Sequence, residues 1–271
     1  MSLEAAVTNA PAQFYAVDAL DRDIPDHLKY GRTLLSKDRQ IIYDGISAAI
    51  RDGQVTYVVP DWVRIGIDDI AGIVHKVWFD HPQYFWFSLT EKGAVGIRYY
   101  NKNNGVTSLE FKYCERCFNE REAMMKAINR QADFILRNVT DGMTDTEKLQ
   151  EIYRYMTQNV EYDYIGAKTM AYSYATGGND LYSTLVDHIG ICDGISRAFM
   201  FLAQRAGVLC SLSSGLESPG VGVGHRWNAV YADGNWYHVD ATNRLFMFRG
   251  QFPKYIYSYR SHAKYIYDNA Y

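Results

Sequence analysis

Three residues in the second half of the chain have types that work together in covalent catalysis. Cys192 follows Ile189-Gly190-Ile191 and precedes an apolar stretch with helical spacing, so we expect it to open a helix. The first turn of a helix offers free N–H groups and the positive end of the helix dipole, and both favour a thiolate. Together with His225 and Asp240, such a thiolate is suited to attack an acyl carbon. The imidazole then holds or returns the proton, and the carboxylate fixes the imidazole tautomer.

The stretch HRWNAVYADGNWYHVDAT predicts how His225 and Asp240 are brought together. Asp233-Gly234 is typical of a type I′ turn between two antiparallel strands. With a two-residue loop, Trp227 lies opposite Asp240, and His225 shares their face of the sheet because side chains alternate along a strand. His225 and Asp240 are then diagonal neighbours, about 7–8 Å apart at the backbone. A four-residue loop gives the same register, whereas a three-residue loop places the two on opposite faces.

Each candidate also has an ordinary structural interpretation. Most cysteines outside disulfides act as small buried apolar side chains. A histidine is often a hydrogen-bonded structural group, and Asp240 is also suited to capping a turn. His188 lies four residues before Cys192 and competes for the role of base. His238 shares the face of His225 but lies opposite Ala229 and is therefore farther from His225.

The neighbours of these residues are assigned structural roles. Asp193 is expected to be a helix-start carboxylate, and Arg226 and Asn228 are expected to point away from His225. Cys114-Glu115-Arg116-Cys117 is half of a zinc site, with no second pair to complete it, and a structural role is favoured over a redox role. Cys210 begins a strand and is expected in the core.

Hydrophobic periodicity predicts the elements that position these residues. Helices are expected over 34–50, 67–79, 115–139, 145–160 and 192–207, and strands over 54–59, 84–89, 94–100, 107–113, 208–216, 225–232 and 235–242. A loop is expected over 161–179, and the KYIY repeats at 254–257 and 264–267 are predicted to be two short strands. Helices followed by strands indicate an α+β fold. We divide the chain into an N-terminal mixed α/β region, 1–115, and a core, 116–271.

The sequence around the candidate residues resembles the bacterial branch of the transglutaminase-like superfamily. The resemblance rests on GICDGISRAFMFLAQRAGV and GHRWNAVYADGNWYHVDAT, with DTEKLQEIYRYMTQNVEYDY upstream, and it covers residues 144 to 242. HPQYFWF and the strands after it resemble the N-terminal portion of the same bacterial proteins more loosely.

The resemblance implies a papain-like core in which a helix carrying the cysteine packs on an antiparallel sheet. It assigns the nucleophile to Cys192, the base to His225 and the orienting carboxylate to Asp240. It further implies an oxyanion hole made by the backbone N–H of Cys192 and an upstream side chain. Tyr182 is the candidate for that side chain, and Trp227 is a candidate for the substrate groove.

One feature near the site departs from the family pattern, and a second has two alternative interpretations. Many relatives follow the aspartate with Thr-Trp and a later Asp-Pro, but this chain has Ala241-Thr242-Asn243-Arg244. The departure concerns the substrate groove more than the three catalytic candidates. The glycine-rich stretch SPGVGVGH, which leads into His225, is either a lid or channel wall or a mobile loop.

The leading hypothesis is therefore a cysteine-dependent acyl-transfer enzyme acting on peptide or protein amides. Transfer to water would make it a protease or amidase, and transfer to an amine a transglutaminase; both stay open. No cofactor or metal is expected. The alternatives are a non-catalytic binding or scaffold module of the same fold, and a carbohydrate-binding surface formed by tyrosines and tryptophans.

Composition excludes several other classes of function. The charge is nearly balanced, with 28 Lys and Arg against 31 Asp and Glu, so a nucleic-acid-binding surface is not expected. No apolar run reaches the roughly 18 residues of a spanning helix, and the N-terminal sequence lacks the features of a signal peptide. The 23 tyrosines include a C-terminal cluster, expected as a sheet face or a substrate contact. Oligomeric state and compartment stay open.

Overall fold

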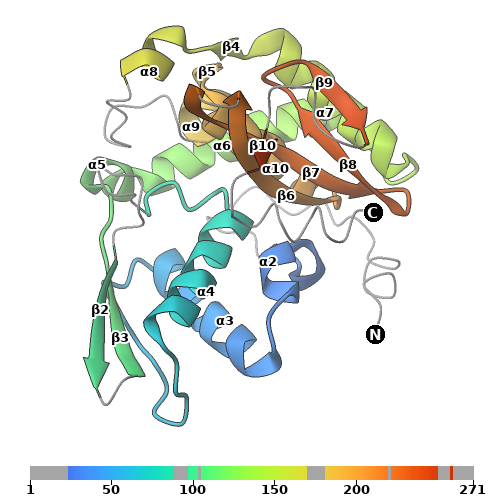
Figure 1. Ribbon diagram of the computed structural model, residues 1–271. Helices are drawn as coiled ribbons and strands as arrows, with labels where there is room; N and C mark the ends of the chain where they lie inside the picture. Colours follow the sequence, from blue (N-terminus) through green and yellow to red (C-terminus); the bar gives the residue numbers. More distant parts are fainter. Residues whose placement is uncertain are drawn as a thin grey trace.

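The structure is a computed structural model (Figure 1), and it describes residues 24–87, 97–102, 105–169, 181–218, 221–249 and 257–258. The lead-in before residue 24, most of the C-terminal tyrosine cluster, most of the first KYIY repeat and all of the second lie outside these ranges. Within them, no helix combines the length and apolar character that crossing a membrane requires.

The N-terminal part of the chain places helices beside a small antiparallel sheet whose strand order is β1-β3-β2. Its elements are η1 (Asp26–Leu28), α2 (Tyr30–Thr33), α3 (Lys37–Arg51), β1 (Thr56–Val58), α4 (Ile67–Asp80), β2 (Ile97–Lys102) and β3 (Gly105–Phe111). Figure 1 shows α3 and α4 close to this sheet, at one end of the molecule.

The rest of the chain surrounds a five-stranded sheet of order β10-β6-β7-β8-β9, whose neighbouring strands are all antiparallel. Its helices are α5 (Glu115–Asn119), α6 (Arg121–Ile135), η2 (Leu136–Asn138), α7 (Asp145–Asn159), α8 (Tyr164–Thr169), α9 (Leu181–Leu185) and α10 (Cys192–Arg205). The strands of the five-stranded sheet are β6 (Leu209–Ser218), β7 (Val221–Ala232), β8 (Asn235–Asp240), β9 (Leu245–Phe248) and β10 (Tyr257–Ser258), and β4 (Glu161–Tyr162) and β5 (Ile189–Gly190) form a separate two-stranded parallel sheet. This arrangement of helices and antiparallel sheets confirms the α+β prediction.

Helix α10 is central to the C-terminal part of the fold. One face of α10 presents Ala198, Phe199 and Leu202, which are completely buried, and the helix contacts β6 and β7 (Figure 1). It ends where Gly207 adopts a φ of 80°, a left-handed conformation that costs glycine least. The predicted start and end of this helix are both confirmed, and they place Cys192 in its first turn.

The β7–β8 hairpin has the predicted turn and register. Asp233 and Gly234 have φ values of 50° and 83°, as the two central residues of a type I′ turn require. Ala232 pairs with Asn235, and the ladder continues to Asn228 opposite Val239. The two-residue loop is therefore confirmed, and with it the face that His225 shares with Asp240.

Four predictions differ from the structure. The described end of the glycine-rich stretch, residues 221–224, belongs to β7 and pairs with β6, so it is not a loop. Residues 84–87 form turns with an isolated bridge from Phe87 to Tyr113, because all four side chains are buried and none alternates outward; the rest of that predicted strand lies outside the described ranges. The predicted helix over 115–139 is divided at Glu120 into α5 and α6 and ends in η2. The predicted loop from 161 contains β4 and α8 within its described part.

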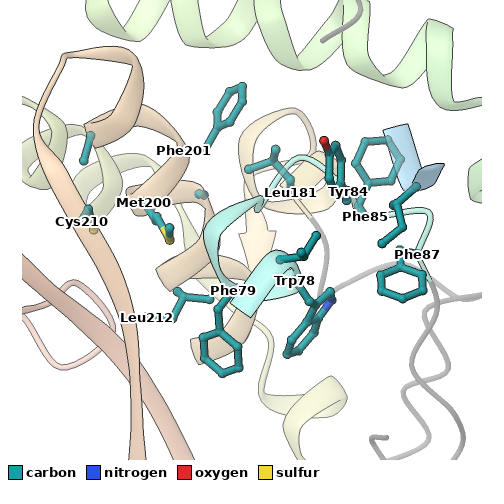
Figure 2. Packing of buried hydrophobic residues seen from close by; sticks show 14 of the residues in the cluster. Trp78, Phe79, Tyr84, Phe85, Phe87, Leu181, Met200, Phe201, Cys210 and Leu212 are labelled. Carbon is teal, nitrogen blue, oxygen red and sulfur yellow. The ribbon is translucent and has the colours of Figure 1, made fainter. Parts of the chain in front are cut away.

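The main hydrophobic core draws side chains from both sides of residue 115. Figure 2 shows Trp78 and Phe79, at the end of α4, beside Leu212 of β6, and all three belong to one buried cluster. Gln204 of α10 donates a hydrogen bond of 2.9 Å to the backbone carbonyl of Asp80. Helix α10 therefore packs against the N-terminal part of the chain, and the division into 1–115 and 116–271 stays a prediction.

Candidate active site

Cys192 is the first residue of α10, with Ile191 as the N-cap in extended conformation. Its side chain is partly accessible, whereas the other three cysteines, Cys114, Cys117 and Cys210, are buried. Burial also raises the pKa of the Cys210 thiol, which makes that sulfur a poor nucleophile. By position and access, Cys192 is the cysteine suited to react with a substrate.

His225 lies between Cys192 and Asp240. Its Nε2 atom is 2.7 Å from Oδ2 of Asp240, and both side chains are almost fully buried. The His225 side chain also hydrogen-bonds to Cys192. Because Nε2 is engaged with the carboxylate, Nδ1 is the ring nitrogen left for the sulfur. The structure thus brings the three predicted residues into one chain of contacts.

The surroundings of His225 favour its charged form. Burial is the largest influence and lowers the pKa, but the hydrogen bonds and negative charges of Asp240 and Cys192 outweigh it and raise the pKa to about 10. An imidazolium beside the sulfur stabilises a thiolate. The contact with Cys192 is therefore made by a histidine that favours its charged, imidazolium form.

Asn243 is a member of this network that the sequence reasoning missed. Its backbone N–H donates to Oδ1 of Asp240 at 3.1 Å, and its side-chain amide donates to Oδ2 at 2.9 Å. The same amide nitrogen is 3.2 Å from Nε2 of His225. Because Nε2 carries the proton shared with Asp240, the Asn243 amide donates to the Asp240 carboxylate and not to Nε2. This bond holds the carboxylate in place. The sequence signal was the Asp-x-x-Asn spacing of a turn that an aspartate caps.

Trp227 contacts both His225 and His238 on the same face of the sheet. The Trp227 ring is 1% exposed and stacks on His225, with ring centroids 5.9 Å apart and an interplanar angle of 16°. Its indole N–H donates to Nδ1 of His238 at 3.2 Å. Burial lowers the pKa of His238 to about 4, so His238 is neutral and accepts this bond. Opposite pKa shifts thus distinguish two nearby histidines, and they favour His225 as the acid–base group.

Tyr182 and His188 have contacts with other parts of the structure. Tyr182 is on α9, half-buried, and packs against the main core. His188 adopts a φ of 60°, and its ring lies 6.4 Å from that of Tyr155. The roles predicted for Tyr182 and Trp227 in an oxyanion hole or substrate groove stay predictions.

Cys114 and Cys117 form a separate buried pair. Their sulfur atoms are 2.6 Å apart, and the Cys114 sulfur accepts a hydrogen bond from the backbone N–H of Cys117 at the start of α5. Among the residues that the structure describes, no group of three or more histidine, cysteine or acidic side chains is arranged to hold a metal ion.

Comparison with known proteins finds a family match over the segment that holds the candidate site. Residues 133–241 match the model of the transglutaminase-like superfamily, and this range contains all three catalytic candidates. The resemblance seen in the sequence is therefore confirmed.

Individual relatives are distant and cover part of the chain. Human kyphoscoliosis peptidase is 32% identical over 112 residues, and the mouse protein is 30% identical over 112 residues. Each match covers 38% of this chain but only 16% of the relative's length. Among solved structures, a TGase crystal structure has 17% identity and a TM-score of 0.35, covering 59% of this chain and 47% of that chain.

Proposed function

We propose that the transglutaminase-like domain at residues 133–241 makes this chain a cysteine-dependent acyl-transfer enzyme that acts on peptide or protein amides. In this proposal the Cys192 thiolate attacks the amide carbonyl and forms a thioester. His225 gives its proton to the leaving amine, and Asp240 holds the imidazole and stabilises its charge. Water or an amine then attacks the thioester, with His225 accepting the proton of that nucleophile, and Cys192 is released.

The observation that carries the proposal is the continuous contact from Cys192 through His225 to Asp240, with a pKa of His225 raised to about 10. The relation to kyphoscoliosis peptidase agrees with chemistry on an amide bond. It does not distinguish hydrolysis from transfer to an amine, because both outcomes proceed through the same thioester.

The rival function is a scaffold that kept the fold without the reaction. A scaffold has no use for a buried His225–Asp240 pair that Asn243 holds in place, because each buried polar group costs desolvation. Reactivity of the thiol separates the two functions, since a retired site would leave Cys192 no more reactive than an ordinary thiol.

The first prediction concerns this reactivity. Under limiting iodoacetamide at pH 7, we expect Cys192 to be alkylated well before Cys114, Cys117 and Cys210, because it is the accessible sulfur and is paired with His225. Peptide mapping by mass spectrometry identifies the modified residue. Incubation with peptide mixtures, followed by a search for an acyl adduct on Cys192, tests the transfer step.

Cys192→Ala is expected to lose both the alkylation and the adduct, while Cys210→Ala serves as the matched control and keeps both. Alkylation of Cys192 no faster than that of a small-molecule thiol of ordinary acidity would refute the enzyme and favour the scaffold.

A further inference from the structure

A partly buried ion cluster includes the residue that follows the candidate nucleophile. Asp193, the residue after Cys192, accepts hydrogen bonds from Nε of Arg197 at 3.3 Å to each carboxylate oxygen. Arg226, the residue after His225, donates to Oδ1 of the same carboxylate from the sheet. One carboxylate therefore holds two guanidinium groups, one from its own helix and one from β7.

The N-terminal part of the chain covers this cluster. The Arg197 guanidinium lies 3.9 Å above the ring centroid of Trp78, and Arg226 lies 5.4 Å from the same ring. The Phe79 ring centroid is 5.3 Å from the Arg226 guanidinium. Aromatic faces attract cations, and this attraction is stronger where water is excluded. The rings therefore confine both arginines beside Asp193.

Arg226 and His225 are on opposite faces of β7, as adjacent strand residues must be. A second contact on the Arg226 face joins β7 to α10, where the Asn228 amide donates to the backbone carbonyl of Ser196 at 2.9 Å. On β7 the two contacts involve Arg226 and Asn228, which are two positions apart. On α10 they involve Asp193 and Ser196, which are three positions apart. They hold the first turn of α10 along β7 in one register.

The cluster also compensates the charge beside the thiol. Burial raises the pKa of Asp193, but the charges and hydrogen bonds of Arg197 and Arg226 outweigh it, so the pKa stays below its ordinary value. Asp193 is therefore an anion next to Cys192, and alone it would oppose a thiolate there. With two arginines, the cluster has a net positive charge.

We infer that Arg226, acting through Asp193, is a positioning residue that holds Cys192 against His225. The catalytic part of this inference rests on the proposed function. Its structural basis is that the ion pair joins the positions that immediately follow the nucleophile and the base, across the boundary between α10 and β7. Displacement of a reacting group by about 1 Å can cost about a hundredfold in rate, so the position of this one contact matters.

The second prediction tests the inference with Arg226→Met, which keeps much of the apolar stem but removes the guanidinium. We expect Cys192 alkylation at pH 7 to slow by about tenfold to a hundredfold, with the rate recovering partly at higher pH. The titration of His225, followed by NMR of 15N-labelled histidine, is expected to move to lower pH, because its partner Cys192 is displaced.

The matched control is Arg205→Met, at the other end of α10. Arg205 bonds Asp133 and Asn129 of α6, so its loss removes a comparable ion pair remote from the site. We expect Arg205→Met to lower the melting temperature without changing either readout. Arg226→Lys, which restores one positive charge without the planar fork, is expected to recover part of the alkylation rate, and it replaces Arg226→Met if that variant does not fold.

The variant Asp193→Asn and the double variant complete the test. If the two residues act through one contact, the loss in the double variant is expected to be no greater than the larger single loss. If both Arg226 variants keep the alkylation rate and the His225 titration of the wild type, the inference is wrong and the proposed function stands. If Cys192 of the wild type is alkylated no faster than an ordinary thiol, but the His225 titration still moves in Arg226→Met, the proposed function is refuted and the positioning role is supported.

Discussion

At the scale of single residues, the Asp240 carboxylate controls the charge of His225. Its two oxygens are satisfied by His225 and by both N–H donors of Asn243, so it stays in one orientation. The carboxylate raises the pKa of His225 against the lowering effect of burial. Removing only the charge of Asp240 therefore tests the electrostatic argument with little change in volume.

The third prediction concerns Asp240→Asn. A histidine whose pKa rises from 6.5 to about 10 on folding contributes stability that is complete below pH 6.5 and lost as the pH rises through about 10. The wild type is therefore expected to lose free energy of unfolding between pH 7 and pH 10. Asp240→Asn should lose less over this range, because its His225 is already neutral over more of it. Urea unfolding at several pH values measures the difference, and parallel curves for the two proteins would contradict the prediction.

At the scale of elements, the hairpin that carries the base is fastened to a helix far away in sequence. The Asp233 carboxylate, at the hairpin tip, accepts hydrogen bonds of 3.2 Å from the backbone N–H groups of Asp145 and Thr146 at the start of α7. Thr144 adds a capping box with Glu147 at the same helix end. One aspartate thus forms the turn and supplies a second cap to the helix.

The fourth prediction separates these two roles of Asp233. Asp233→Gly tolerates the positive φ but loses the cap, so we expect the free energy of unfolding to fall by about 1 kcal/mol. Asp233→Asn keeps the turn and an acceptor oxygen, and a change within about 0.5 kcal/mol is expected. Chemical denaturation measures both. If both variants lost the same free energy of unfolding, the cap that residue 233 supplies to α7 would contribute nothing to stability.

The elements that carry the site were predictable because their signals are local. Helix α10 has apolar spacing that ends at Gly207, and the β7–β8 hairpin has an Asp-Gly turn that fixes its register. The division at Glu120 was not predictable, since residues 115–135 contain neither glycine nor proline. The buried turn at 84–87 has the composition of a strand, and only its packing against helices determines its shape.

Contacts between distant elements were the least predictable part of the site. Alternation along β7 correctly placed Arg226 on the face away from His225, but it did not show what that face meets. The partner, Asp193, is 33 positions away. Asn243 was likewise missed, although its aspartate partner is only three positions before it. The candidate triad follows from residue type and strand register, whereas its supporting residues depend on the tertiary fold.

At the scale of the whole molecule, helix α10 packs against the part of the chain that precedes residue 116. Trp78 and Phe79 belong to the main core together with side chains of α10 and β6 (Figure 2). Arg197 places its charge on the Trp78 ring and donates to the Trp78 carbonyl at 3.5 Å. The N-terminal region therefore completes the surroundings of the site.

The fifth prediction follows from this shared core. A fragment of residues 116–271 is expected to lack cooperative thermal unfolding and to bind a dye that detects exposed apolar surface, because removal of α4 uncovers the α10 and β6 side chains. Adding the separate 1–115 fragment should restore a folding transition. A fragment that melts as sharply, and at the same temperature, as the full chain would instead establish 116–271 as an independent domain.

The β7–β8 hairpin has a consequence for the order in which the site assembles. His225 and Asp240 are only 15 positions apart, and hairpins close in about 1–10 µs. The contact between α10 and β7 that brings Cys192 to His225 requires the closure of a longer loop and the docking of preformed elements. We expect the base and its carboxylate to meet early in folding, before the thiol joins them. A nascent or partly folded chain would then have an ordinary cysteine, and the nucleophile would become reactive only as folding is completed.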